Sequence, residues 1–327
     1  MRAPLVDGFG RVHTDLRLSL TDRCNLRCTY CMPAEGLDWL PKPELLTDDE
    51  LVRLAGVFAS MGVTTVRLTG GEPLLRRGLP GLIARLSGLG LSLSLTTNGL
   101  GLERQAQALR EAGLARVNVS LDTLQPERFL ELTRRDRFSD VLAGLAAAKR
   151  AGLEPVKVNT VLMRGVNDDE APALLRWALD EGYALRFIEQ MPLDPQHDWD
   201  RATMVDADAI LEQLGRHYTL TPVKSRGSAP AEQFLVDGGP AVVGVVGSVS
   251  RPFCASCDRL RLTADGQVRN CLFARDESDL RTPLRAGADD DELAGRLRIA
   301  VAGKKAGHGI GEPDFVQPDR PMSAIGG

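Results

Sequence analysis

The stretch LSLSLTTNGLGLERQAQALREAGLARVNVSLD, residues 91–122, contains one complete strand–helix–strand unit. The runs LSLSLTT and RVNVSLD have the composition and alternation of β-strands, and LERQAQALREAGL between them is amphipathic and ends at a glycine. Two strands joined by a helix usually lie parallel in one sheet. The stretch therefore predicts a parallel sheet covered by helices.

The same unit repeats along the chain on both sides of this stretch. Further strand-like runs lie at 17–21, 64–70, 155–163 and 184–191. A helix is expected over 47–62, where Thr47 and Glu50 have the spacing of a capping box, and another over 138–153. Six strand–helix units predict an α/β fold, an incomplete (β/α)6 TIM-like barrel. Since a closed barrel has eight strands, something else must cover the open side.

The segment 221–327 departs from this rhythm and is the candidate cover. It opens with residues rich in Pro, Gly and Ser, continues with a strand-like run at 241–250, and then has a hairpin pattern that turns at Asp265-Gly266. We therefore expect a barrel domain over 1–220 and a smaller C-terminal domain over 221–327 that covers the open side.

Composition limits the classes of partner. The 327 residues carry a formal net charge of −4 and 43% hydrophobic residues. No basic footprint for nucleic acid or an anionic membrane is present, no apolar run approaches a membrane span, and the first residues do not resemble a signal peptide. The expected location is the cytoplasm, with no nucleic acid and no membrane as partner.

The cysteines are the strongest chemical signal. There are six, and they fall into two groups of three, Cys24, Cys28, Cys31 and Cys254, Cys257, Cys271. The hairpin would carry the last of them back towards the two before it. In a reducing compartment such grouping indicates metal binding.

Two kinds of metal site fit three thiols. A cubane iron–sulfur cluster has four iron corners, so three cysteines leave one iron free for another ligand. Zinc would need a fourth protein ligand, for which His13 is available to the first group and His308 to the second. Spacing alone leaves both readings open.

Polar residues and glycines gather where the predicted strands end. Because ligands bind at the carboxyl ends of parallel strands, one rim of the barrel is the expected active site, although residues of these types also form turns. The residues are Gly70, Gly71, Glu72, Thr96, Thr97, Asn98, Ser120, Asp122, Glu189 and Met191.

Two motifs carry a family resemblance. CNLRCTYC at 24–31 resembles the CxxxCxΦC signature of radical S-adenosylmethionine enzymes, and GGEP at 70–73 is similar to their motif for the methionine amino group. Within that superfamily, this sequence resembles the GTP 3′,8-cyclases of molybdenum cofactor biosynthesis over essentially its full length. The shared features are RLTGGEPLLRR, NVSLD, VKVN, RFIEQMP, CxxCxRxR with a later Cys, and a final IGG.

The resemblance implies two [4Fe-4S] clusters and S-adenosylmethionine as cofactors. Cys24, Cys28 and Cys31 would hold the first cluster, whose open iron binds S-adenosylmethionine. Reductive cleavage then gives a 5′-deoxyadenosyl radical, which abstracts the ribose 3′ hydrogen of GTP to form (8S)-3′,8-cyclo-7,8-dihydroguanosine 5′-triphosphate. Cys254, Cys257 and Cys271 would hold the second cluster, with its open iron on the guanine.

The resemblance also implies residue roles at matching positions. The contacts to S-adenosylmethionine would be Tyr30, Gly71, Ser120 and Met191. The contacts to GTP would be Arg17, Arg67, Thr96, Lys157, Arg259 and Arg261. The residues expected to support catalysis directly are Gly326, Gly327, Arg259 and Arg261.

Simpler explanations exist for several of these residues. Arg17 and Arg67 could form interior ion pairs, Lys157 could be a solvated strand residue, and the terminal glycines could be frayed. The stretch GKKAGHGIG at 303–311 predicts a solvated loop, with phosphate binding as the alternative.

The expected partners are the GTP substrate, an external electron donor, and the downstream cyclic pyranopterin monophosphate synthase, with a homodimer as a further expectation. Two other classes of protein compete with the cyclase. One is a two-cluster radical enzyme that acts on a peptide, and the other is a redox-inert zinc scaffold.

Overall fold

The computed structural model describes residues 2–224 and 226–326, and it confirms the predicted strand–helix rhythm. The six strands of the predicted barrel are β1 (Asp15–Ser19), β2 (Thr65–Thr69), β3 (Ser92–Thr97), β4 (Leu114–Ser120), β5 (Lys157–Val161) and β6 (Ala184–Ile188). The helices that accompany them are α1 (Asp48–Ser60), α2 (Leu79–Ser87), α3 (Leu102–Glu111), α4 (Pro126–Thr133), α5 (Phe138–Arg150) and α6 (Ala171–Glu181).

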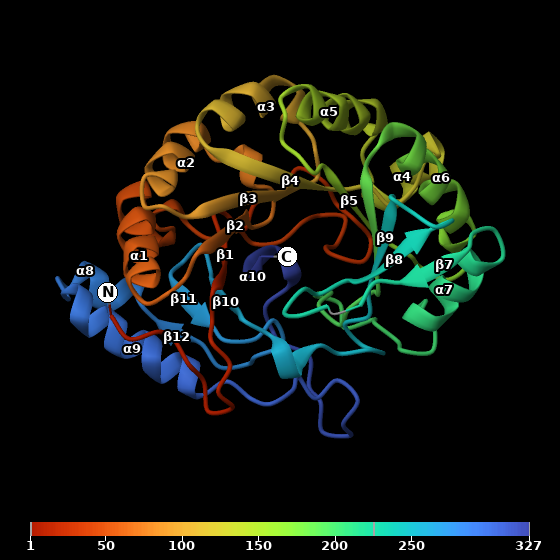
Figure 1. Cartoon of the computed structure of the whole chain (residues 1–327). Coiled ribbons are helices and arrows are strands. Elements are labelled where there is room, and N and C mark those ends of the chain that lie inside the picture. Colours follow the sequence, from red (N-terminus) through yellow and green to blue (C-terminus); the bar gives the residue numbers. More distant parts are fainter. Residues whose placement is uncertain (1, 225, 327) are drawn as a thin grey trace.

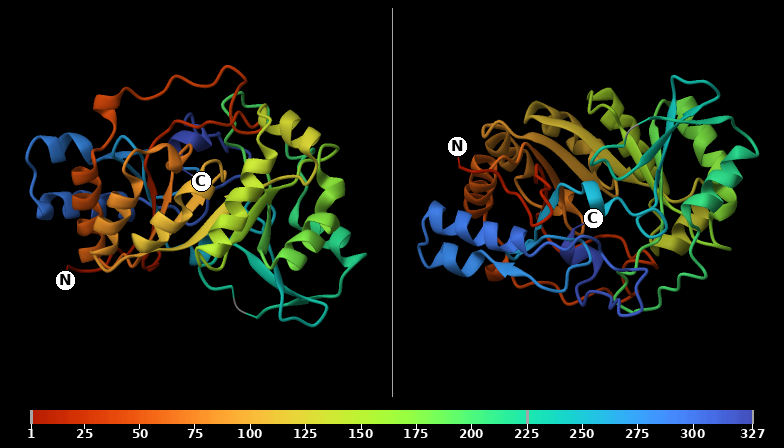
Figure 2. Two further views of the ribbon diagram at one scale, coloured as in Figure 1. Left: turned by 90° about the horizontal axis from the view of Figure 1, so that it is seen from above. Right: turned by 60° about the horizontal axis from the view of Figure 1, so that its bottom comes forward.

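These strands pair in chain order and all run parallel. They form an arc with the helices on its convex side (Figures 1 and 2). The incomplete barrel is therefore confirmed. None of the described helices is both long and apolar enough to cross a membrane.

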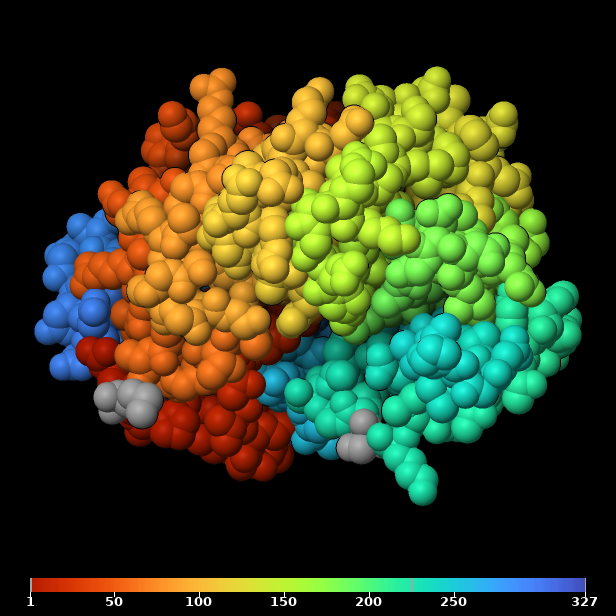
Figure 3. All heavy atoms as spheres, turned by 45° about the horizontal axis from the view of Figure 1, so that its top comes forward, coloured from red at the N-terminus to blue at the C-terminus, as the bar shows by residue number. Residues whose placement is uncertain are grey.

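The last third of the chain lengthens the arc at both ends. Strand β9 pairs parallel to β6 and β10 pairs parallel to β1, so that eight neighbouring strands run in one direction. Antiparallel strands continue the sheet beyond each of them, and the segments after residue 230 appear at opposite edges of the molecule (Figure 3). These strands are β7 (Leu220–Pro222), β8 (Glu232–Val236), β9 (Val242–Val246), β10 (Arg259–Leu262), β11 (Gln267–Arg269) and β12 (Ser278–Asp279).

The predicted cover thus also extends the sheet, a role that the sequence pattern did not indicate. Pairing between strands that are far apart in the chain leaves no local signal in either strand. The hairpin that turns at Asp265-Gly266 is confirmed as β10 and β11. A division into two domains at residue 220 stays a prediction.

Alternation along the strands separates a core from a polar interior. In β1, Leu16 and Leu18 have no exposed surface and pack towards the helices, whereas Arg17 between them lines a pocket inside the arc. Because side chains alternate across a strand, each strand can supply one apolar face to the core and one polar face to the interior. The fold therefore places charged side chains inside the barrel.

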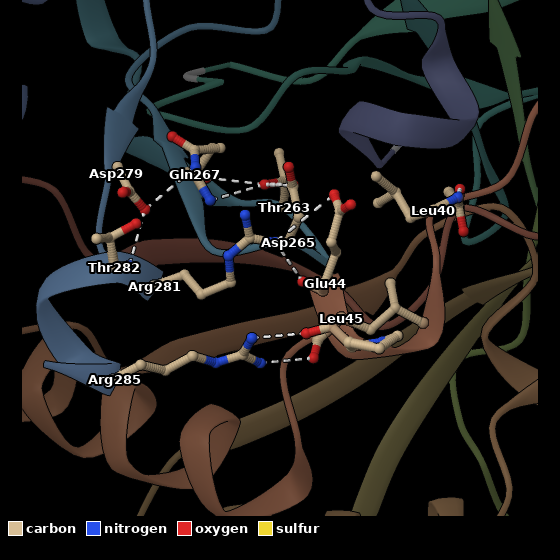
Figure 4. A network of polar contacts seen from close by, with 12 residues as sticks. Leu40, Glu44, Leu45, Thr263, Asp265, Gln267, Asp279, Arg281, Thr282 and Arg285 are labelled. Carbon is tan, nitrogen blue, oxygen red and sulfur yellow. Dashed lines mark hydrogen bonds and ion pairs between the residues drawn. The ribbon is translucent and has the colours of Figure 1, made fainter.

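The helices of the C-terminal part are α7 (Ala207–Gly215), α8 (Arg281–Arg285), α9 (Asp290–Ala302) and α10 (Met322–Ile325). Helix α8 fastens this part to the segment before α1. Arg281 donates to the Glu44 carbonyl at 2.6 Å and Arg285 donates to the Leu45 carbonyl at 3.0 Å (Figure 4). The predicted capping box of Thr47 and Glu50 is confirmed at the start of α1.

Helix α10 lies inside the arc, near its centre (Figure 1). Ile325 has no exposed surface, and Ser19 at the end of β1 donates to its carbonyl at 2.9 Å. Residues 322–326 are therefore packed in the barrel, and the alternative of a frayed end is wrong for them. Gly327 lies outside the described residues.

Candidate active site

The first cysteine triad lies in the loop that follows β1. Cys24, Cys28 and Cys31 are free and line one pocket, and the Cys31 N–H donates to the Cys28 carbonyl at 3.0 Å. Burial raises the pKa of the Cys28 thiol well above its usual value and that of Cys31 to about 12. Such thiols stay protonated unless a metal takes up the charge of the thiolate.

The glycine pair after β2 packs against the start of this loop. A Cβ on Gly70, whose φ is +137°, would lie 2.2 Å from the Thr21 carbonyl oxygen. A Cβ on Gly71 would lie 2.3 Å from the carbonyl oxygen of Arg23. Only glycine fits at both positions, so these two residues bring the end of β2 against the triad loop.

Glu72 connects the strand ends behind the triad. It is fully buried and accepts from the Thr97 hydroxyl at 2.7 Å and from the Asn98 N–H at 2.7 Å. Burial raises the pKa of Glu72 to about 7. The Asn98 side chain reaches back to 3.8 Å from Cys24 Sγ. This carboxyl therefore holds the ends of β2 and β3 in place beside the cysteines.

The four residues predicted to contact S-adenosylmethionine come together in the pocket of the first triad. They are Tyr30, Gly71, Ser120 and Met191. The Tyr30 hydroxyl donates to Asp122 at 2.7 Å, and burial raises the pKa of that aspartate to about 6. The tail residues Met322 and Ser323 complete the wall, which sequence reasoning missed because nothing local indicates where a chain end packs.

The second triad is assembled across the hairpin, as predicted. Cys254 begins the short helix η4 (Cys254–Ser256), Cys257 follows it, and Cys271 comes after β11. All three line a second pocket. Burial alone would raise the pKa of Cys257, but the positive charges of Arg259 and Lys304 bring it below its usual value.

Arginines from neighbouring strands form a row inside this second pocket. Strand register places Arg261 of β10 beside Arg17 of β1, and Arg17 beside Arg67 of β2. Arg186 of β6 also lines the pocket, and a Cβ on its partner Gly244 would lie 3.0 Å from the Arg186 side chain. Sequence reasoning missed Arg186, although its alternation with Leu185 and Phe187 carried the same signal as Arg17.

The row has a large excess of positive charge. Arg17 pairs with Asp15 at 3.2 Å, whereas no carboxylate pairs with Arg67 in the part of the chain that the structure describes. Burial and then neighbouring cations lower the pKa of Arg261 to about 9 and that of Arg186 to about 10. An interior ion pair thus explains Arg17 in part and does not explain Arg67. The pocket is built to receive an anion.

The other predicted GTP contacts have different positions. Arg259 and Thr96 line the second pocket. Lys157 is half-buried in β5, and it is not among the described residues that line the pocket. Burial, followed by Arg186 and Arg116, lowers its pKa to about 7. Lys157 therefore belongs to the same field of positive charge rather than to solvent.

The two pockets share one wall. The residues that line both of them are Thr96, Asn159, Ile188 and Met191. The Thr96 hydroxyl and the side-chain oxygen Oδ1 of Asn159 are buried there, and neither has a hydrogen-bond partner among the described residues. Ligands bound on the two sides of this wall would supply partners for these polar atoms.

The tail reaches the boundary between the pockets. Arg261 donates to the Gly326 carbonyl. Gly326 has a φ of +88°, and a Cβ there would lie 2.1 Å from the Ser19 hydroxyl and 2.3 Å from the Thr69 hydroxyl. Glycine is therefore required at this position.

The histidines considered as zinc ligands have other partners. His308 Nε2 lies 2.9 Å from the Ser248 carbonyl, and its Nδ1 lies 3.1 Å from the Ile310 nitrogen. His13 lies 3.1 Å from Asp7 and does not line the pocket of the first triad within the described residues. The donor set at each triad is thus three thiols with room for a further ligand, which fits a [4Fe-4S] cluster.

Comparison with known proteins agrees with this geometry. The Radical SAM superfamily model matches residues 18–178, and the Molybdenum Cofactor Synthesis C model matches residues 183–310. A GTP 3′,8-cyclase of Streptomyces coelicolor is 65% identical over 328 residues, covering 99% of this chain and 96% of the relative. The chain belongs to the GTP 3′,8-cyclase family. Another relative with that name, from Mycolicibacterium smegmatis, is 59% identical over 332 residues, covering 99% and 92% of the two chains.

Solved structures share the fold of this GTP 3′,8-cyclase family member. Streptococcus suis SuiB bound to S-adenosylmethionine matches with a TM-score of 0.61 at 15% identity, over 96% of this chain and 78% of that chain. Native anSMEcpe with bound AdoMet matches with a TM-score of 0.54 at 16% identity, over 86% and 82%. Membership in the radical S-adenosylmethionine superfamily confirms that a [4Fe-4S] cluster and S-adenosylmethionine are the cofactors, and the second cluster follows from the GTP 3′,8-cyclase family.

Proposed function

We propose that this chain is a radical S-adenosylmethionine GTP 3′,8-cyclase, acting early in molybdenum cofactor biosynthesis. The observation that carries the proposal is the back-to-back arrangement of the two triads. Their pockets share one wall, and among the described residues the arginines line the second pocket and not the first. A site that generates a radical thus adjoins a site that holds a polyanion.

The first pocket would bind and orient the cofactor. Cys24, Cys28 and Cys31 would hold a [4Fe-4S] cluster whose fourth iron takes S-adenosylmethionine. When reduced, this pair would supply the 5′-deoxyadenosyl radical that removes the 3′ hydrogen of GTP. Ribose C3′ would then join guanine C8, and one further electron from the external donor, with one proton, would complete the cyclic nucleotide. Tyr30, Gly71, Ser120 and Met191 would orient S-adenosylmethionine towards the shared wall.

The second pocket would hold GTP. The triphosphate is matched by guanidinium groups, which bind phosphate bidentately. The groups proposed for it are Arg17, Arg67, Arg259 and Arg261, with Arg186 added from the geometry, Lys157 supplying charge and Thr96 lying at the shared wall. Cys254, Cys257 and Cys271 would hold the second cluster, beside which guanine would bind.

The tail would orient the substrate arginines. The Gly326 carbonyl accepts from Arg261, so it fixes the direction in which that guanidinium points. Gly327, which lies outside the described residues, is proposed with Gly326 as a catalytic residue. Both glycines suit a crowded position because they bring backbone without a side chain.

Three further partners are proposed with this function. An external electron donor would reduce the first cluster, and cyclic pyranopterin monophosphate synthase would use the product. A homodimer and a cytoplasmic location are proposed from the family resemblance.

The test is substrate-dependent cleavage of S-adenosylmethionine. The chain is reconstituted with iron and sulfide without oxygen, reduced, and assayed for 5′-deoxyadenosine with and without GTP. The proposal predicts stimulation specific to GTP and a product isomeric with GTP. Release that does not respond to GTP would refute the substrate, and no release from protein with intact clusters would refute the radical chemistry.

A further inference from the structure

Residues 303–308 lie beside the second triad, which Lys304 contacts at Cys257 and His308 contacts at Cys254. Lys304 is only 4% exposed, so the prediction of a solvated loop is wrong for it. Arg11 fastens the segment, since it donates to the Cys254 carbonyl at 2.6 Å and to the Lys305 carbonyl at 2.7 Å. The segment and the triad are therefore held as one unit.

The buried ammonium of Lys304 points at the cysteines. Its Nζ lies 3.5 Å from Cys257 Sγ and 2.7 Å from the Arg259 carbonyl oxygen. In the described residues, no carboxylate forms an ion pair with it. A buried cation requires an anionic partner, and the thiolate of Cys257 is the atom in position to provide it.

We propose that Lys304 is a positioning residue for the second iron–sulfur cluster. Its ammonium group donates a hydrogen bond to the Cys257 thiolate and raises the reduction potential of the cluster. The inference rests on the second cluster of the proposed function. Reduction adds one electron to the cluster, and a nearby positive charge and a hydrogen bond to sulfur both favour the more negative state. The electron comes from the external reductant.

The same contact connects the cluster to the substrate site. The Lys304 ammonium has several N–H donors, so it can bond to Cys257 and to the Arg259 carbonyl at the same time. The second of these bonds fixes the backbone between Cys257 and Arg259. The Arg259 guanidinium lies 4.4 Å from the centroid of the Phe253 ring and lines the second pocket. Loss of Lys304 should therefore affect the cluster first and GTP binding second.

The test compares neighbouring lysines in the full-length reconstituted enzyme. Lys304→Met removes the charge and the donor, Lys304→Gln keeps a donor without the charge, and Lys304→Arg keeps the charge. Lys305→Met is the matched control, because Lys305 is the exposed neighbour. Redox titration followed by electron paramagnetic resonance gives both potentials, and a Cys24→Ala, Cys28→Ala, Cys31→Ala background assigns the signal of the second cluster.

At a fixed potential near the midpoint, Lys304→Met should lower the ratio of reduced to oxidised second cluster about tenfold, equivalent to about 59 mV for one electron. Lys304→Gln should lower this ratio as well, while Lys304→Arg and Lys305→Met should keep the wild-type ratio. The first cluster should titrate unchanged in every variant. If Lys304 had only a structural role, the potential of the second cluster would not follow the charge of the side chain at position 304.

Two results would overturn the inference or its basis separately. A second-cluster potential equal to wild type in Lys304→Gln overturns the role of Lys304, and this variant serves if Lys304→Met fails to keep its iron. Wild-type protein that binds only one cluster overturns the proposed function itself. Iron content and a thermal melt of each variant separate these two results from misfolding.

Discussion

Each triad consists of three cysteine thiols, but the two triads lie in opposite electrostatic surroundings. The first lies beside the carboxyl groups of Glu72 and Asp122, and burial raises the pKa values of its thiols. The second lies among arginines and Lys304; burial raises the pKa of Cys254 there as well, but Arg259 and Lys304 lower the pKa of Cys257. Three thiols therefore do not distinguish the two sites from each other, and the charges around them do. A sulfonium suits the first pocket and a triphosphate suits the second.

The largest effect should come from removing one ligand in each triad. Cys28→Ala should abolish formation of 5′-deoxyadenosine, and Cys257→Ala should abolish the cyclised product while some cleavage of S-adenosylmethionine remains. Each variant should keep about four of about eight irons, because each cluster holds four. Iron analysis and chromatography of both products provide the measurement. Loss of all iron from either variant would show that the two regions are not independent.

The second largest effect should come from a methyl group on Gly326. It would meet Ser19 and Thr69, so Gly326→Ala should displace the tail and lower cyclisation on the order of 100-fold. Both clusters should remain. Gly295→Ala is the matched control, since a Cβ there meets nothing within 4 Å. An active Gly326→Ala variant would contradict the proposed role of the tail.

Substitution of Arg67 tests the difference in charge between the two pockets. Arg67→Met should weaken GTP binding roughly 10- to 100-fold, equivalent to about 1.5–3 kcal/mol for lost hydrogen bonds to a charged group. Binding of S-adenosylmethionine should not change. The protein without GTP should melt at a higher temperature, because a half-buried cation that has no carboxylate partner among the described residues is removed. Arg216→Met, at an exposed pair with Glu212, should alter none of these quantities.

The smallest effect should be a pH dependence from Lys157. Its pKa is lowered to about 7, so it is charged below that pH and neutral above it. GTP binding should weaken by roughly twofold to fivefold, about 0.5–1 kcal/mol, as pH rises through this value, relative to Lys157→Arg. The arginine variant cancels titration of GTP itself. Calorimetry in two buffers should also detect proton uptake on binding near the upper end of the window, and equal uptake in both proteins would contradict the assignment.

The sequence by itself determined the repeating elements and the ligands. Alternation and helical spacing are local properties, so residues 91–122 were enough to predict a parallel sheet with helices outside it. Both triads were visible because a cysteine group with fixed spacing is chemically specific. The GGEP motif was readable through its resemblance to a family motif, and the structure then supplied the steric reason for its two glycines.

Only the tertiary structure decided how distant segments complete the site. The pairing of β9 with β6 and of β10 with β1 brings Arg261 beside Arg17, and no local pattern specifies such register. The same holds for the Gly326 contact and for Lys304, which looked like part of a solvated loop. The physical reason is that charge, burial and contact depend on what surrounds a side chain, and those surroundings come from residues far away in the chain.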